Sequence, residues 1–123
     1  MIAGIGTDMI EIGRVEKACA KEAFFLRVFS QEERNMIGTD WKRAAGNFAV
    51  KESVAKMFGT GFRGIQLKEI EVLRDELGKP YVILSGMAKE RADEQHVGSI
   101  HVSITNTKEY ASAFVVGEIA EQA

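Results

Sequence analysis

The sequence predicts an α+β fold in which a mostly antiparallel sheet packs against one long helix and several short ones. The stretch from Asp40 to Phe58 contains no proline, is rich in alanine and is followed by Gly59, all of which favour a long helix. Residues 100–105 alternate apolar and polar side chains, and residues 110–116 form a second β-prone segment after a short connection. One long helix combined with neighbouring strands is typical of the α+β class.

The bulk composition is that of one folded domain over residues 1–123. Hydrophobic residues make up 46% and charged residues 28%, far from the disordered and membrane classes. A formal net charge of -2 argues against a general nucleic-acid binder, which is usually basic. Cys19 is the only cysteine, so no intrachain disulfide can form, and there is no basic leader or long apolar run. We therefore expect a cytoplasmic protein with no nucleic-acid or membrane partner.

The chain opens with a predicted strand at residues 2–10, in which Gly4 and Gly6 allow close approach of another backbone. Asp8 breaks the pattern, because aspartate is among the residues least favoured in strands. Strand alternation puts Asp8 on the same face as the two glycines. Two interpretations stay open: Asp8 ends the strand and caps the next helix, or it has a functional role.

Residues 11–29 show helical spacing of apolar side chains that is broken near Glu22, which predicts one bent helix or two short ones. Ser30 and Glu33 have the spacing of a capping box, so a short helix should follow and end at about Ile37.

The long helix carries one charged residue on its apolar face. The apolar face consists of Trp41, Ala45, Phe48, Ala49 and Ala55. Glu52 lies near its centre and should face the core, where an unpaired carboxylate is costly. Lys56, one turn later, could neutralise it through an i,i+4 ion pair; a bound metal ion is the other interpretation.

The remaining elements are strand 65–74, turn 75–80, strand 81–84, a capped polar helix at 85–95, and strands 100–105 and 110–116. Residues 59–64 form a glycine-rich loop that matches neither a Walker loop nor a dinucleotide fingerprint. Its glycines would still let backbone amides approach a phosphate or a nucleotide.

Two further groups of residues suggest ligands. Asp8 and Glu52 are two carboxylates from separate elements, which suits a hard ion such as Mg²⁺ together with substrate phosphates.

A basic helix face is the second group, because Arg14, Lys17 and Lys21 are spaced three and four apart. This basic face is either simply solvated or a dock for an acidic partner. A second basic cluster consists of Lys42 and Arg43. His96 and His101 are isolated, and a histidine metal site is not expected.

Several motifs together resemble the holo-acyl-carrier-protein synthases, the short bacterial 4′-phosphopantetheinyl transferases. The motifs are Gly4-Ile5-Gly6-Thr7-Asp8, Phe48-Ala49-Val50-Lys51-Glu52-Ser53, Lys56, Gly59-Thr60-Gly61, Gly78-Lys79-Pro80-Tyr81 and Val102-Ser103-Ile104-Thr105. Their order and spacing match from end to end, so the combination is much more specific than any single motif.

The resemblance implies the 4′-phosphopantetheinyl transferase fold and a magnesium-dependent transferase of fatty acid biosynthesis. It implies transfer of the 4′-phosphopantetheine group of coenzyme A to a serine of an acidic apo acyl carrier protein, with adenosine 3′,5′-bisphosphate released. It also implies a homotrimer with active sites at subunit interfaces. Mn²⁺ is an alternative metal. The rival functions are a transferase for a peptidyl or polyketide carrier and a non-catalytic coenzyme A binding protein.

Site residues follow from the resemblance by position. Asp8 and Glu52 would hold the metal, Lys56 would meet the pyrophosphate, and these three are the expected catalytic residues. Glu52, Glu33 or a water would take the serine proton. Arg14, Lys17 and Lys21 would dock the carrier. The expected coenzyme A contacts are Lys42, Arg43, Asn47, Lys56, Gly59, Thr60, Gly61, Asn106 and Thr107.

This chain departs from the family pattern at two of these positions. Many relatives carry arginine where this chain has Asn47 and histidine where it has Asn106, at the 3′-phosphate end of coenzyme A. Asparagine donates hydrogen bonds but brings no charge. Lys42, Arg43, Thr107 or Lys108 are the candidates to compensate.

Overall fold

The computed structural model describes residues 1–121 and confirms the α+β class. In chain order the elements are β1 (Ile2–Glu11), α1 (Ile12–Cys19), α2 (Glu22–Val28), α3 (Gln31–Ile37), α4 (Trp41–Phe58), a short 3₁₀ helix (Leu67–Glu69), β2 (Ile70–Arg74), β3 (Pro80–Leu84), α5 (Gly86–Glu94), β4 (Val97–Asn106) and β5 (Tyr110–Ile119). Within the described residues, none of the helices has the length and apolar character that a membrane crossing requires.

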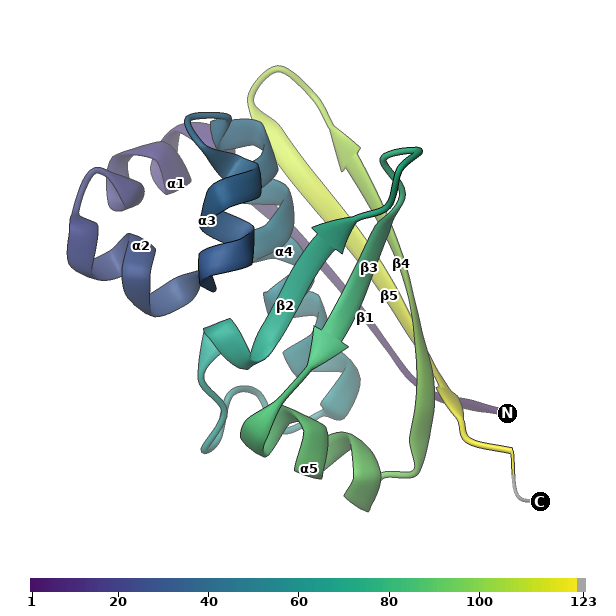
Figure 1. Ribbon diagram of the computed structural model, residues 1–123. Coiled ribbons are helices and arrows are strands. Elements are labelled where there is room, and N and C mark those ends of the chain that lie inside the picture. The colour runs from purple at the N-terminus through teal and green to yellow at the C-terminus, as the bar shows by residue number, and fades with distance from the viewer. Residues whose placement is uncertain (122–123) are drawn as a thin grey trace.

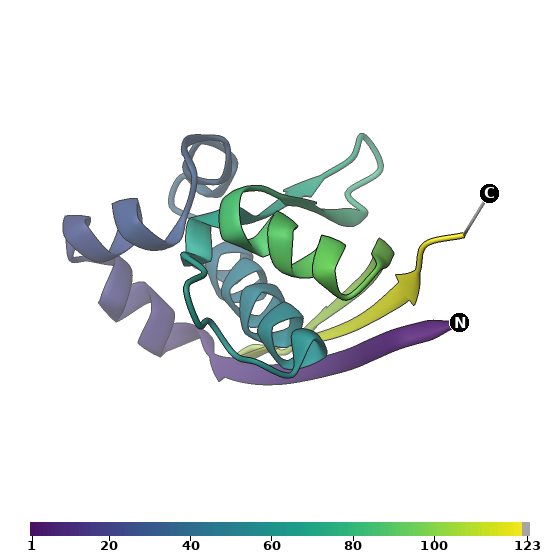
Figure 2. The same cartoon turned by 90° about the horizontal axis from the view of Figure 1, so that it is seen from below.

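The strands form two antiparallel sheets rather than one. β5 lies in the middle of a three-stranded sheet with β1 and β4 at its edges, and β2 pairs with β3 in a hairpin. The long helix α4 lies between these two layers, with the three-stranded sheet on one side and the hairpin with α5 on the other (Figures 1 and 2). The main core therefore forms on both sides of α4, from residues of α4, the hairpin, α5 and β5.

The helix α4 is the best-predicted element. Asp40 is its N-cap and accepts hydrogen bonds from the amides of Lys42 and Arg43, and Gly59 ends it in the left-handed conformation, with φ of 76°. The expectation of one apolar face is wrong, because α4 is covered on both sides and is buried around most of its circumference.

The short elements confirm some of the sequence-based expectations and correct others. Residues 11–29 form two helices, and the capping box at Ser30 is present. The strand expected at residues 65–74 begins only at Ile70. Ser85 precedes α5 without a side-chain cap.

Two glycines bring β1 into direct contact with α4. A Cβ atom on Gly6 would lie 1.8 Å from the carbonyl oxygen of Ser53, and one on Gly4 would lie 2.4 Å from that of Met57. Any side chain at these positions would push the strand off the helix. The close backbone approach expected at Gly4 and Gly6 is therefore the packing of β1 against α4.

A buried ion pair connects α3 to α4. The ammonium of Lys51 lies 2.8 Å from a carboxylate oxygen of Glu33, and both side chains are completely buried. Burial lowers the pKa of Lys51, while the Glu33 carboxylate opposes that change. Lys51 also donates to the carbonyls of Leu67 and Ile70. These bonds hold the chain before β2 in a turn, which explains the late start of that strand.

The lone cysteine lies in a second core, between α1, α2 and the first half of α4. Cys19 is buried there, and its burial raises the pKa of its thiol to about 11. The thiol is therefore protonated at neutral pH.

Gly6→Ala should destabilise the protein by about 3 kcal/mol or more, because the new methyl group collides with backbone that cannot move away cheaply. Gly13→Ala is the matched control: a Cβ there meets nothing within 4 Å. Since Gly13 is helical, this variant should gain up to about 1 kcal/mol. Urea unfolding measures both, and equal stabilities would contradict the close packing.

Candidate active site

Asp8 lies within β1, on the face that looks toward α4. Its carboxylate accepts a hydrogen bond from the ammonium of Lys56 at 3.1 Å, and the same ammonium donates to the carbonyl of Thr7 at 3.0 Å. The interpretation of Asp8 as a helix cap is wrong, because Glu11 occupies the N-cap position of α1. Asp8 is thus a strand aspartate fixed to the last turn of α4.

Glu52 is half-buried beside this pair. Burial raises the pKa of Glu52, the charge of Asp8 raises it further, and Lys56 opposes both effects. The ion pair expected between Glu52 and Lys56 does not form, since Lys56 bonds Asp8 instead. Within residues 1–121, Glu52 makes no ion pair.

The pair of carboxylates fits a hard divalent cation. Asp8 and Glu52 repel one another and share only one ammonium, so a cation between them would relieve the repulsion. The described residues contain no group of three or more histidine, cysteine or acidic ligands. Two carboxylates whose ion completes its shell with water and substrate oxygens are the donor set typical of Mg²⁺.

Glu33 is not available as a proton acceptor in this structure. Its carboxylate is completely buried and already accepts bonds from Lys51, Asn47 and the amides of Ser30 and Val72. The expectation that Glu33 could serve as a general base is therefore wrong for this conformation.

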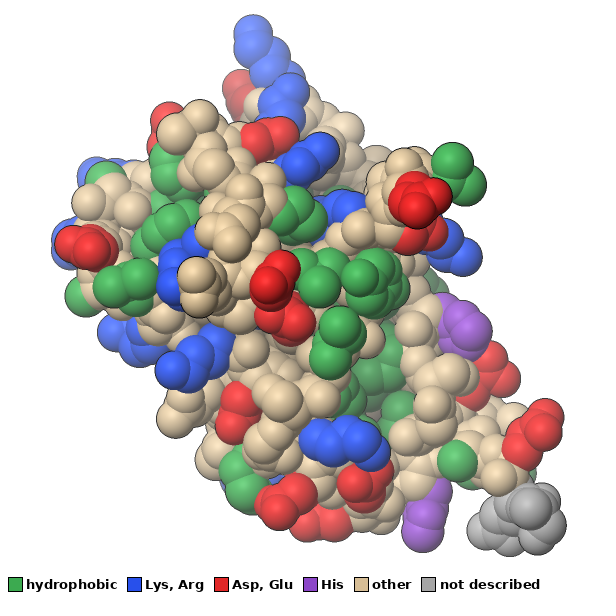
Figure 3. Space-filling view, in the orientation of Figure 1, with side chains coloured by type: hydrophobic (Ala, Val, Ile, Leu, Met, Phe, Trp, Pro, Cys, Tyr) green, Lys and Arg blue, Asp and Glu red, His purple; other side chains and the backbone are tan. Residues whose placement is uncertain are grey.

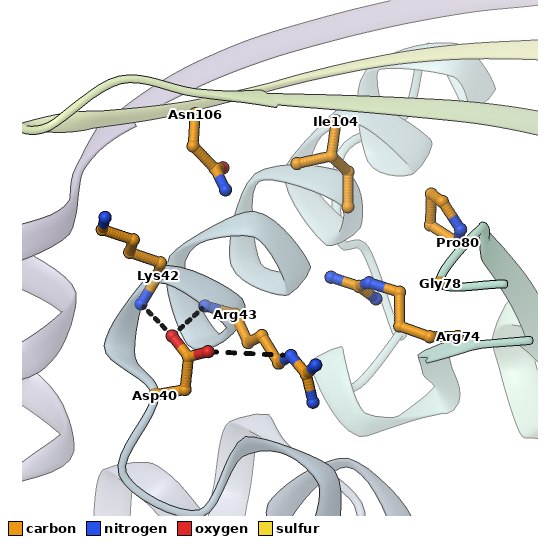
Figure 4. Close-up of a pocket in the computed structure, with 8 residues that line it drawn as sticks. All are labelled: Asp40, Lys42, Arg43, Arg74, Gly78, Pro80, Ile104 and Asn106. Carbon is orange, nitrogen blue, oxygen red and sulfur yellow. Dashed lines mark hydrogen bonds and ion pairs between the residues drawn. The ribbon is translucent and has the colours of Figure 1, made fainter. Parts of the chain in front are cut away.

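A polar pocket of about 320 Å³ lies at the other end of α4 (Figure 4). It is lined by Asp40, Lys42, Arg43, Arg74, Gly78, Pro80, Ile104 and Asn106. Three of the predicted coenzyme A contacts, Lys42, Arg43 and Asn106, thus lie together. Arg74 was missed by sequence reasoning, because only the hairpin brings the end of β2 to this pocket.

Asn47 does not reach this pocket. Its side chain is completely buried, and its amide donates to Glu33 at 3.0 Å and to the carbonyl of Val72 at 2.9 Å. The expectation of a direct coenzyme A contact at Asn47 is wrong for this structure. Thr107 is outside the pocket lining, and its hydroxyl accepts from the amides of Glu109 and Tyr110 in the turn before β5.

The glycine-rich loop follows α4 directly, next to Lys56. Gly59, Gly61 and Gly64 all have positive φ. The guanidinium of Arg91 in α5 donates to the hydroxyl of Thr60 and to the carbonyl of Arg63. The helix α5 therefore fixes the shape of this loop, which begins three residues after Lys56.

The predicted contacts fall into two separate groups. Asp8, Glu52 and Lys56 meet at the last turns of α4, whereas Lys42 and Arg43 lie on its first turn. At about 1.5 Å of rise per residue, Lys42 and Lys56 are about 20 Å apart along the axis. One chain does not enclose both groups in a single pocket.

The third predicted group lies in a groove formed by α1 and α2. Arg14, Lys17 and Lys21 line this groove, which has a volume of about 630 Å³. Arg27 extends the basic lining, and its guanidinium lies 5.8 Å from the ring centroid of Phe24, which also lines the groove. Figure 3 shows lysine and arginine side chains over this helical part of the molecule. Arg27 could have been found by extending the basic pattern into the second helix.

The paired carboxylates with Lys56 and the polar pocket with its cationic lining are compatible with a transferase that acts on a phosphate-containing substrate. Residues 4–115 match the model of the 4′-phosphopantetheinyl transferase superfamily, and the chain belongs to that family. Within it, the chain groups with the holo-[acyl-carrier-protein] synthases. The synthase of Lachnoclostridium phytofermentans is 59% identical over 122 residues, which are 99% of this chain and 100% of that protein.

Solved structures agree. The Helicobacter pylori holo-[acyl-carrier-protein] synthase in complex with coenzyme A superposes with a TM-score of 0.82 and 30% identity, covering 93% of this chain and 99% of that one. The Bacillus anthracis synthase in complex with CoA (3′,5′-ADP) has a TM-score of 0.80 and 36% identity, covering 98% and 99%. These matches confirm the transferase class and the fold predicted from the sequence.

Glu52→Gln should raise the free energy of unfolding at neutral pH in EDTA, because it removes a charge that burial and Asp8 disfavour. The folded-state pKa is the raised one. The gain should therefore appear as the pH rises above the unfolded-state value of about 4.3 and be complete above the folded-state pKa. Glu16→Gln, on the exposed face of α1, should change stability by less than about 0.5 kcal/mol. A less stable Glu52→Gln variant would show that Glu52 is satisfied without a cation.

Proposed function

We propose that this chain transfers the 4′-phosphopantetheine group of coenzyme A to a serine of apo acyl carrier protein in fatty acid biosynthesis. The released product is adenosine 3′,5′-bisphosphate. The observation that carries this proposal is the meeting of Asp8, Glu52 and Lys56 at the last turns of α4, in a chain of this transferase family. The single cysteine supports a reducing, cytoplasmic setting.

Asp8 and Glu52 would hold Mg²⁺, with Mn²⁺ as an alternative of similar ligand preference. Bound there, the metal would neutralise charge on the pyrophosphate as its phosphoanhydride bond breaks and the serine oxygen bonds to the phosphorus of the transferred group. Lys56 would contribute a second positive charge, and its bond to the carbonyl of Thr7 supports a fixed direction for its ammonium. With Glu33 occupied, Glu52 or a water molecule takes the proton of the attacking serine hydroxyl.

The coenzyme A site would be completed by a second copy of the chain in a homotrimer. The two groups of contacts at opposite ends of α4 support this arrangement, because one copy could present Lys56, Gly59, Thr60 and Gly61 while its neighbour presents Lys42, Arg43, Asn106 and Thr107. The outward face of the three-stranded sheet supports an interface as well. Ile5, Met9 and Phe114 on that face are 57%, 66% and 48% exposed.

The basic groove of Arg14, Lys17, Lys21 and Arg27 would receive the acyl carrier protein. An acidic helix fits a groove that combines a basic rim with an aromatic and alanine floor. Part of this groove is formed by α1, which directly follows β1 in the chain. Asp8 lies only a few residues before α1, which supports delivery of the serine to the acidic pair.

Intact-mass spectrometry of apo acyl carrier protein incubated with this enzyme, coenzyme A and Mg²⁺ tests the reaction. We expect a mass gain of one phosphopantetheine group that EDTA abolishes. Light scattering on the same sample reports the assembly state. With a folded carrier and an active control synthase, the absence of any gain would support another carrier or, if coenzyme A still binds, the non-catalytic alternative.

Arg14→Glu should lower kcat/KM for the carrier by about 10-fold or more, since it places a negative charge in the path of an acidic partner. The KM for coenzyme A should stay unchanged. Lys89→Glu makes the same charge change on the exposed part of α5 and serves as control. The difference between the two variants should shrink as salt is added. If both variants lowered kcat/KM for the carrier equally, the effect would come from the net charge of the protein, and the docking role of Arg14 would be contradicted.

A further inference from the structure

Arg74 is a half-buried cation whose only hydrogen bond within residues 1–121 is weak. Its guanidinium donates to the carbonyl of Leu73 at 3.4 Å and forms no ion pair with the described residues. Burial lowers the pKa of Arg74, and the neighbouring Arg43 lowers it further, against the opposing charges of Glu33 and Asp40. A guanidinium in such surroundings gains most from an anion that fills its donors.

The pocket around Arg74 has more positive than negative charge. Lys42, Arg43 and Arg74 line it, and Asp40 is its only acidic lining residue. The Asp40 carboxylate is already engaged by the first amides of α4, at 3.2 and 3.3 Å, and by Arg43 at 3.7 Å. Figure 4 shows Arg74 extending from β2 toward α4, between Arg43 and Ile104. The charge that remains unmatched is therefore on the Arg74 side.

Arg74 lies beside Gly46 of α4. A Cβ atom on Gly46 would lie 3.7 Å from a terminal nitrogen of Arg74 and 3.2 Å from Ile104. The guanidinium thus lies against the bare backbone of α4, where a polar ligand in the pocket can meet it. The other polar side chain on this wall, Asn106, can add a hydrogen bond but no charge.

Coenzyme A carries phosphate at two places, a pyrophosphate that reacts and a 3′-phosphate that does not. The reacting group must lie at the acidic pair and Lys56, about 20 Å along α4 from the first-turn pocket. With the basic groove of α1 and α2 assigned to the carrier, the first-turn pocket is the cationic site left for the second phosphate, whichever copy of the chain contributes it. A phosphate monoester concentrates nearly two negative charges on one phosphorus, which suits a site with two guanidinium groups.

We propose that Arg74 binds the 3′-phosphate of coenzyme A and lets this chain discriminate coenzyme A from its dephosphorylated form. This proposal rests on the proposed function. It also accounts for the missing charge at Asn106 and at the buried Asn47: the positive charge comes instead from the end of β2.

The test compares coenzyme A with dephospho-coenzyme A, which lacks only the 3′-phosphate, in calorimetric binding to the wild type, Arg74→Gln and Arg74→Lys. Arg74→Gln should weaken coenzyme A binding by about 10- to 100-fold, the usual effect of losing a charged hydrogen bond. It should leave dephospho-coenzyme A binding unchanged. Arg74→Lys keeps the charge without the two-pronged geometry and should fall between. Lys68→Gln, at an exposed site outside this pocket, should match the wild type for both ligands.

Turnover gives a second readout. Arg74→Gln should raise the KM for coenzyme A by a similar factor with little change in kcat, because the contact is remote from the reacting bond. Equal weakening of both ligands, or of neither, would overturn the role of Arg74. If the wild type binds coenzyme A with this selectivity but transfers nothing, the proposed function fails while the assignment of Arg74 stands.

Discussion

The buried pair of Lys51 and Glu33 is the constraint on which the rest of the structure depends. It joins α3, α4 and the start of β2 at one point, with both charges removed from water. Removal of one partner from such a pair costs about 3–5 kcal/mol, because the other charge remains buried. The pair therefore sets the rotation of α4 about its axis. Glu52, the next residue, is thereby directed to the side where Asp8 lies.

The candidate site residues of α4 lie at its two ends, because the middle of the helix is buried between the three-stranded sheet and the hairpin. The first turn contributes Lys42 and Arg43 to the polar pocket, and the last contributes Lys56 and leads into the glycine-rich loop. The middle is occupied by packing: Gly4 and Gly6 admit the strand on one side, and the hairpin closes the other. One rigid element thus sets the spacing between the acidic pair with Lys56 and the polar pocket of Lys42 and Arg43.

Much of the fold could be predicted because its signals are local. The capping box at Ser30 and the limits of α4 at Asp40 and Gly59 depend on neighbouring residues alone. The strand position of Asp8 follows from alternation. Lys51 could not be placed, because a lysine is ordinarily expected at the surface and its burial depends on Glu33, 18 residues earlier. Arg74 was missed for the same reason: the residues around it belong to α4 and β4, and the sequence near Arg74 does not indicate them.

The buried Cys19 has a consequence for an enzyme that handles coenzyme A. Thiol–disulfide exchange begins with attack by a thiolate, and a thiol with a pKa of about 11 supplies almost none at neutral pH. The donor that we propose and the modified carrier both end in a free sulfhydryl. Because Cys19 is shielded by α1, α2 and α4, neither can form a mixed disulfide with the folded chain. The fold therefore protects this thiol from exchange with the coenzyme A pool.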